Sequence, residues 1–186
     1  FEIDGGDFDE AERCFQLALD IKPDFIKAKI NLASVYLNKG SQDDFKEAYN
    51  IAEWLWNQSE KKDPTIFEIF IWSKFHHQSP QEAIIFYEGS KEAQTLVKKH
   101  EKLSNLIATI YFSEKNIDKS EELVDQALKL ASQTPHNLML KARTLMAEAQ
   151  TKAIIPSAFE VIPKFKKYEE IEKALEFLKQ ALEIAK

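Results

Sequence analysis

The sequence predicts an all-α protein made of amphipathic helices. Glycine and proline are scarce, at 4 and 6 of 186 residues, whereas hydrophobic residues make up 44% and charged residues 30% of the chain. This usage favours helix almost throughout. Apolar residues recur at helical spacing, and the apolar segments are bounded by residues that begin or end helices. A chain of this length and apolar content can also bury a core of its own.

The first helix is expected over residues 7–22. Asp7 can cap its first turn, and Glu10 lies three residues later, as in a capping box. Pro23 ends the helix because it lacks a backbone N–H and disfavours helix at the preceding residue. One apolar stripe runs along this helix and consists of Ala11, Phe15, Ala18 and Leu19.

The later helices are expected from the same kinds of signal. Gly40 suits the position just past a helix end. Asp63-Pro64, Ser79-Pro80 and Thr134-Pro135 each place a capping residue before a proline in the first turn. Pro156 and Pro163 prevent one continuous helix near the end of the chain. These signals predict helices at 25–39, 44–60, 64–77, 80–99, 101–114, 117–132, 135–151 and 168–185.

A pattern of small and apolar residues recurs along the chain. Its first member is a small residue, followed four, seven and eight residues later by small or apolar ones. The copies begin at Ala11, Ala48, Ala83, Ser120 and Ala174, and the third copy is the weakest. Between copies lies a second helix pattern, in which alanine precedes tyrosine by three residues, as at Ala33/Tyr36 and Ala108/Tyr111. Repeats of this kind bury their apolar faces only against neighbouring repeats.

These patterns resemble the tetratricopeptide repeat (TPR) family. The likeness is strong over residues 6–40 and good over 102–128. It rests on Gly6, Ala11, Phe15, Ala18, Leu19, Pro23, Leu32, Ala33, Tyr36, Gly40 and Ala48. The sequence departs from the family in a longer loop at residues 41–44 and in Asn116, which replaces the usual turn glycine. The resemblance implies an α-solenoid, a right-handed TPR-like superhelix of antiparallel helix pairs.

The resemblance also implies how the chain is organised. We expect a single TPR-like solenoid over residues 1–186. It would comprise a half unit at 6–24 and units at about 25–60, 64–99, 101–132 and 135–186, with an insertion at 151–167. The helix at 7–22 is the second half of a pair, so a preceding helix should complete it. We therefore expect the chain to be a fragment of a longer protein.

Composition and motifs argue against several classes of function. The net charge of −6 provides no basic field for nucleic acid or lipid, and no apolar run is long enough to insert into a membrane. The single cysteine, Cys14, excludes an internal disulfide, and His76 and His77 point about 100° apart on a helix, which suits one metal ion poorly. Nucleotide-binding and hydrolase motifs are absent from the sequence. We expect no enzyme activity, no catalytic or metal-binding residue, no cofactor and a cytoplasmic location.

The resemblance implies that a partner lies in the concave groove lined by the first helix of each pair. The candidate residues are Lys27, Asn31, Ser34, Asn38, Phe67, Phe70, Lys102, Asn105, Thr109, Phe112 and Arg143. They combine apolar anchors with amide and cationic donors, a mixture that suits a peptide or an amphipathic helix. We therefore expect a protein–protein interaction scaffold, with Phe70 and Phe112 as anchors. The alternative for each residue is an ordinary structural position.

Two other interpretations remain open. The segment Thr65 to Phe75 is apolar on every side, which predicts burial on every side, either by a partner or in the core of an irregular repeat. Lys27 and Asn31 resemble the first pair of a TPR clamp for a C-terminal carboxylate tail, as in co-chaperones, although the next helix offers Phe67 and Phe70 instead of an amide. Single-stranded RNA binding is a weaker alternative, because it requires a basic groove.

Overall fold

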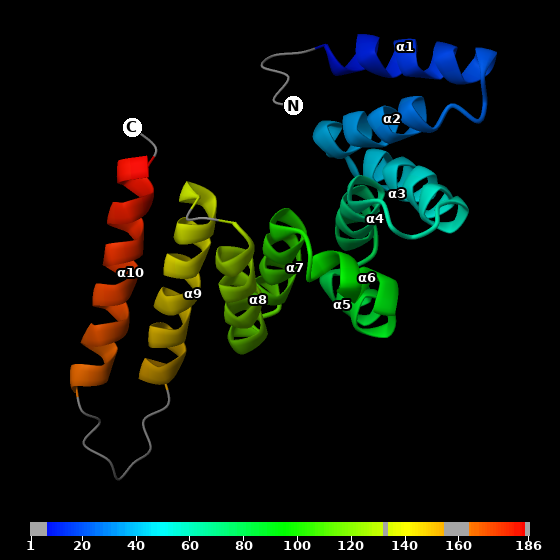
Figure 1. The fold of residues 1–186 in the computed structure, drawn as a ribbon. Coiled ribbons are helices and arrows are strands. Elements are labelled where there is room, and N and C mark those ends of the chain that lie inside the picture. The colour runs from blue at the N-terminus through cyan, green and yellow to red at the C-terminus, as the bar shows by residue number, and fades with distance from the viewer. Residues whose placement is uncertain (1–6, 132–133, 155–163, 185–186) are drawn as a thin grey trace. The chain divides into compact units, whose positions relative to one another are not determined.

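A computed structural model describes residues 7–131, 134–154 and 164–184 (Figure 1). These residues form ten α-helices and no strand. The predicted all-α fold of packed helix pairs is therefore confirmed. The chain divides into two compact units, Phe1–Leu96 (unit 1) and Val97–Lys186 (unit 2), which we describe one at a time.

Unit 1 is a succession of helices, and from α1 to α5 each packs on the next. Its helices are α1 (Phe8–Ile21), α2 (Ile26–Lys39), α3 (Gln42–Gln58), α4 (Pro64–His77), α5 (Pro80–Gly89) and α6 (Lys91–Val97), the last of which ends at the first residue of unit 2. Neighbouring helices from α1 to α5 are in contact, and α2 also contacts α4. Contacts between alternate helices are what a stack of helix pairs requires.

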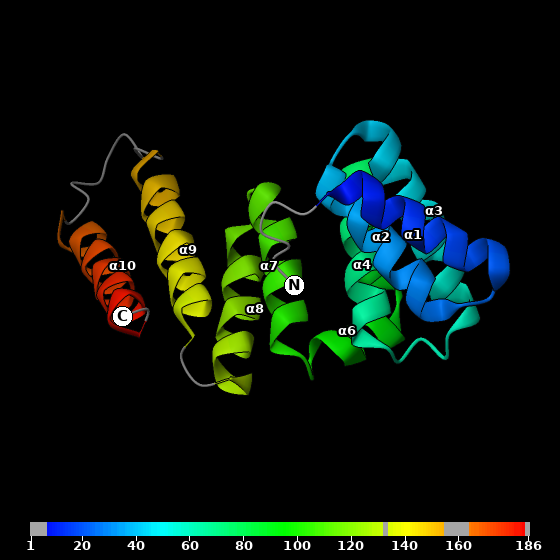
Figure 2. The ribbon, with the colours of Figure 1, turned by 90° about the horizontal axis from the view of Figure 1, so that it is seen from above.

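Unit 2 has the same arrangement. Its helices are α7 (Glu101–Ser113), α8 (Ile117–Leu130), α9 (Pro135–Ile154) and α10 (Lys164–Ile184). Each packs on the next, as Figure 2 shows. In addition, α7 contacts α9. The expected insertion at 151–167 is partly helical, since α9 continues to Ile154 and α10 begins at Lys164; residues 155–163 lie outside the described part. We call α2, α4, α7 and α9 the first helices, and α1, α3, α5, α8 and α10 the second helices.

The helix starts follow the capping signals. Asp63 accepts hydrogen bonds from the backbone N–H of Thr65 and Ile66, and the Ser79 hydroxyl accepts one from Glu82. Asp7 likewise caps α1 by accepting from the N–H groups of residues 9 and 10, at 3.1 Å each. These side chains satisfy N–H groups that have no partner within the helix.

Two turns differ from the expectation. Ser41 and Asp44 form a capping box, so α3 begins at Gln42 and the loop is shorter than predicted. In the turn before α8, Lys115 rather than Asn116 adopts the left-handed backbone, with φ of 60°, and Asn116 caps the helix instead. In unit 1 the residue that adopts the left-handed backbone before α3 is Gly40, with φ of 76°, and glycine does so without steric cost.

The single helix expected over residues 80–99 is wrong, because the chain breaks at Ser90. Ser90 has an extended backbone, and its hydroxyl accepts a hydrogen bond from the N–H of Ala93 at the start of α6. The amide of Gln94 reaches back to the carbonyl oxygen of Glu88 at 2.8 Å. Gly89 and Ser90 together thus end α5 and begin α6, a pair of signals that the sequence interpretation overlooked.

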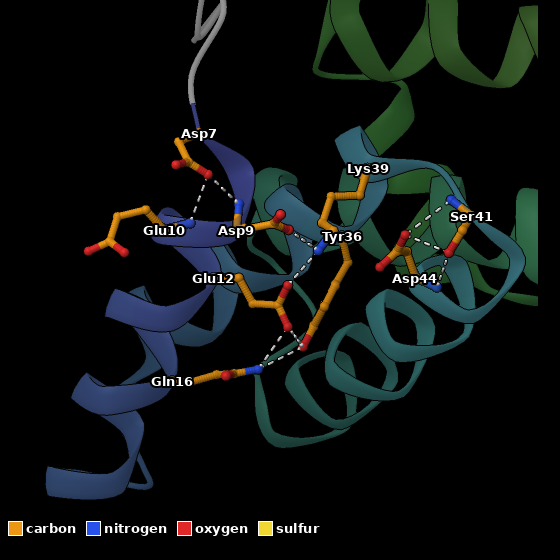
Figure 3. Close-up of polar contacts among 9 residues, drawn as sticks. All are labelled: Asp7, Asp9, Glu10, Glu12, Gln16, Tyr36, Lys39, Ser41 and Asp44. Carbon is orange, nitrogen blue, oxygen red and sulfur yellow. Dashed lines mark hydrogen bonds and ion pairs between the residues drawn. The ribbon is translucent and has the colours of Figure 1, made fainter.

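Polar contacts fasten α1 to α2 (Figure 3). Lys39 Nζ lies 2.6 Å from the carboxylate of Asp9 and 2.8 Å from that of Glu12, and the Tyr36 hydroxyl donates to Glu12 at 3.1 Å. Apolar contacts add to them, since Phe15 and Leu19 pack partly buried against a cluster that includes Tyr36. Even so, α1 has no fully buried residue, and Leu17 and Ile21 are 52% and 88% exposed.

Candidate functional site

One fully buried residue marks the same position on each first helix. These residues are Ala33, Ile71, Ala108 and Ala142, each 0% exposed. The residues one and four positions later are half-buried or exposed: Ser34 and Leu37, Trp72 and Phe75, Thr109 and Phe112, and Arg143 and Met146. We call the surface that carries these eight positions the first-helix face, and we describe it in each unit separately.

In unit 1, α2 presents the polar candidates. Lys27, Asn31 and Asn38 are exposed and Ser34 is half-buried. Two of these side chains are engaged by their own helix, since the Ser34 hydroxyl donates to the carbonyl oxygen of Ile30 and the Asn38 amide donates to that of Ser34. Lys27 and Asn31 make no hydrogen bond within the described residues.

Phe67 and Phe70, which the sequence interpretation placed in the groove, are core residues. They are 0% and 3% exposed. The ring of Phe70 stacks on Trp56 at 5.9 Å and meets Phe86 edge-on at 4.9 Å, and Phe67 lies 5.4 Å from Trp56. The interpretation erred in register, because these residues lie four and one positions before the buried Ile71 and so face the neighbouring helices. Most of the apolar side chains of this segment are therefore buried within unit 1.

The aromatic side chains that α4 leaves partly exposed are Trp72 and Phe75. Their rings stack in parallel at 5.0 Å, and His76 stands edge-on to both while stacking on Phe45 at 4.4 Å. Burial among these rings lowers the pKa of His76. The buried Ala108 lies twelve residues before Ser120, which begins a copy of the repeat pattern, and Ile71 lies twelve residues before Ala83, which begins another. This spacing would have identified Ile71 as the buried position of α4, and therefore Trp72 and Phe75 as the residues one and four positions later.

In unit 2, the first-helix face brings α7 and α9 together at Phe112 and Arg143. The guanidinium carbon of Arg143 lies 5.0 Å from the centre of the half-buried Phe112 ring. Met139 and Met146 lie about one helical turn before and after Arg143, and they are 51% and 36% exposed. Lys102 is exposed on α7, and the half-buried Thr109 donates its hydroxyl hydrogen bond to the carbonyl oxygen of Asn105.

Asn105, expected to supply an amide to a ligand, is instead buried between α7 and α9. It is 4% exposed, and its amide donates to the side-chain oxygen of Asn137, which is fully buried. The other polar atoms of this pair, Asn105 Oδ1 and Asn137 Nδ2, have no hydrogen-bond partner among the described residues. Asn105 therefore contributes to the packing of α7 on α9 and is not accessible on the surface.

Lys141 and Arg143, two of the cationic side chains of α9, have opposite surroundings. Lys141 is 8% exposed, and its ammonium lies 2.7 Å from the carboxylates of both Glu121 and Asp125 on α8. Arg143 points to the other side of the helix and is exposed. Within the described residues, no carboxylate pairs with Arg143. Among the side chains that the structure describes, the positive charge of Arg143 is therefore not neutralised.

Among the described residues, no three side chains of His, Cys, Asp or Glu are grouped so as to hold a metal ion. None of the helices in that part of the chain is long and apolar enough to span a membrane. Cys14 is exposed on α1, rather than packed, with its thiol 3.6 Å from the Glu10 carboxylate.

This arrangement defines a helical-repeat protein whose conspicuous chemistry lies on its first helices. Two segments, residues 3–25 and 102–134, match the family model described as tetratricopeptide repeat. They fall in the regions where the sequence most resembles that family, and these two segments are similar to tetratricopeptide repeats. This likeness supports the interpretation of the chain as a protein–protein interaction scaffold. TPR proteins are generally not catalytic. A search among curated proteins gives no match.

Solved structures of the same fold cover nearly the whole chain. A crystal structure of MamA is 17% identical, with a TM-score of 0.65, over 97% of this chain and 90% of that one. A second MamA structure is 16% identical, with a TM-score of 0.66, over 96% and 86%. TTC0263, a thermophilic TPR protein in Thermus thermophilus, is 17% identical, with a TM-score of 0.60, over 91% of both chains. At these identities the likeness concerns the fold.

Proposed function

We propose that the chain binds a segment of a partner protein on the first-helix face of unit 2. The supporting observation is the group formed by Phe112, Met139, Arg143 and Met146, in which exposed apolar surface surrounds an unpaired cation. Aromatic residues, methionine and arginine are the residue types enriched where proteins bind one another. Methionine also adapts its shape to different apolar partners.

Peptide display on the complete chain tests this proposal. Peptides enriched from a library of random peptides, about 12 residues long to span the α9 surface at roughly 1.5 Å per residue if helical, would be synthesised and their affinities measured by fluorescence anisotropy. Replacing Met139 and Met146 with serine should weaken binding about tenfold or more, since central interface side chains often contribute about 2 kcal/mol or more. The melting temperature should remain unchanged, because both side chains are exposed.

Leu175 provides a matched control. It is 51% exposed, as Met139 is, and it lies in the same unit but on the second helix α10. Leu175→Ser should leave the peptide affinity unchanged. If Leu175→Ser weakens binding as much as Met139→Ser does, or if no peptide is enriched, the proposed location of the site is wrong.

The carboxylate-tail alternative receives less support from unit 1. Lys27 and Asn31 are exposed on α2, but the next first helix carries Trp72 and Phe75 at its accessible positions instead of amides or cations. A clamp for a chain terminus requires several converging donors. We therefore favour an internal peptide segment over a C-terminal tail, and protein over RNA.

A further inference from the structure

The carboxylates of unit 2 are distributed unevenly between its first helices and the second helix α8. Residues 135–147 of α9 contain no Asp or Glu, and α7 contains only Glu101 in its first turn, where it accepts a hydrogen bond from Thr134. The second helix α8 instead carries four carboxylates, Asp118, Glu121, Glu122 and Asp125. The chain as a whole has a net charge of −6, so this shortage of carboxylates on α7 and on residues 135–147 of α9 is unusual for its composition.

Arg143 is a cation of α9 that this distribution leaves available. Its neighbour Lys141 is already saturated by two carboxylates of α8, whereas Arg143 has no carboxylate partner among the described residues. The ring of Phe112 supports the guanidinium from one side, which reduces its freedom before any ligand arrives. A planar guanidinium held in this way can donate two parallel hydrogen bonds to one carboxylate.

We propose that this face selects an acidic amphipathic segment, with an internal Asp or Glu side chain bound by Arg143. This inference rests on the proposed function and adds the chemistry of the partner. Met139 and Met146 lie on either side of Arg143 along α9, so a bound segment continues in both directions past the carboxylate. The acidic residue is therefore internal to the segment and is flanked on both sides by apolar residues that contact the methionines. A free chain terminus would leave one methionine uncovered.

The same peptide selection tests the chemistry when it is repeated on variants of the complete chain. The peptides are displayed with their C-termini fused to the carrier, so only side-chain carboxylates are available to Arg143. Selection on the unchanged chain should enrich peptides with Asp or Glu between apolar residues. Arg143→Gln should lower the affinity for these peptides about tenfold and make that affinity less dependent on salt concentration. Arg143→Glu should enrich Lys or Arg at the central position instead.

Arg13 supplies the matched control, because the chain has only two arginines. Arg13 lies on α1 in unit 1 and is paired with Glu10 at 2.8 Å. Arg13→Gln should change neither the enriched peptides nor their affinities. Enrichment of neutral or basic peptides on the unchanged chain would overturn the inference, as would equal affinities for the unchanged chain and Arg143→Gln. The proposed function would survive either result if binding still depended on Met139 and Met146; failure to enrich any peptide would overturn both.

Discussion

Asn105 and Asn137 share one hydrogen bond in the interior of unit 2, where each also buries a polar atom that has no hydrogen-bond partner among the described residues. The pair joins α7 to α9, the two helices that form the proposed binding face. A buried amide whose hydrogen bond is lost pays its full desolvation cost, so the pair should behave as a unit.

Replacing either asparagine alone should therefore be costly. Asn137→Ala leaves the Asn105 amide without its partner and should lower the free energy of unfolding by about 1–3 kcal/mol. The double replacement Asn105→Ala/Asn137→Ala should cost less than the sum of the two single changes, because no unpaired amide remains. Urea unfolding of the four proteins measures this coupling. Additive effects would show that the hydrogen bond contributes nothing to stability.

Ala33 and Ala108 should tolerate no larger side chain. Both are 0% exposed on first helices. Replacement by leucine should overpack these positions and cost about 1–3 kcal/mol each. Asn31→Leu, at an exposed position two residues from Ala33, should stay within about 0.5 kcal/mol of the unchanged chain. Thermal melts of the three variants test the register, and unaltered melts for both alanine variants would show that it is misplaced.

Helix α1 should be the least protected helix of unit 1. It has no fully buried residue, and ion pairs of Lys39 with Asp9 and Glu12 contribute to its attachment, which salt weakens. Hydrogen exchange should be faster in residues 8–21 than in α2, and faster still at about 0.5 M salt. Exchange as slow as that of residues 102–128 would mean that α1 needs no preceding helix for stability.

His76 should make unit 1 sensitive to mild acid. Burial lowers its pKa in the folded chain below the ordinary value of 6.5. The unfolded chain therefore binds the proton more readily, and stability is lost as the pH falls through that value. His76→Phe keeps a ring against Phe45 and removes the proton site. Between about pH 7.5 and 5.5 its unfolding free energy should fall less than that of the unchanged chain. Parallel pH profiles would show that His76 does not contribute.

Capping residues and prolines in the sequence predicted correctly where some of the helices begin. Asp63-Pro64 and Ser79-Pro80 set the starts of α4 and α5, because a capping side chain and a first-turn proline act within a few residues. The break at Ser90 was missed, because a glycine and a serine within a helical pattern are each tolerated singly. In the structure, the extended backbone of Ser90 and the return of Gln94 to the carbonyl group of Glu88 show that the chain turns there.

The face of a helix is harder to predict than the helix itself. The α4 segment is apolar on every side, so hydrophobic spacing could not distinguish Phe70, which packs on Trp56, from Phe75, which stays half-exposed. On α7 the resemblance to the TPR family implied Thr109 and Phe112 as groove residues, and both are half-buried in the structure. The resemblance could not show that Asn105 is buried, since that depends on Asn137 of α9, 32 residues away.

The exposed outer surface of α1 makes this end of unit 1 a place for engineered extension. Leu17 and Ile21 offer apolar side chains to an added element, while the opposite side of the helix already holds α2. Because repeat arrays depend on contacts between adjacent elements, a designed helix hairpin fused ahead of α1 would need to match only this one helix. The array could then be lengthened, or given a second recognition surface, without altering any residue of the proposed site.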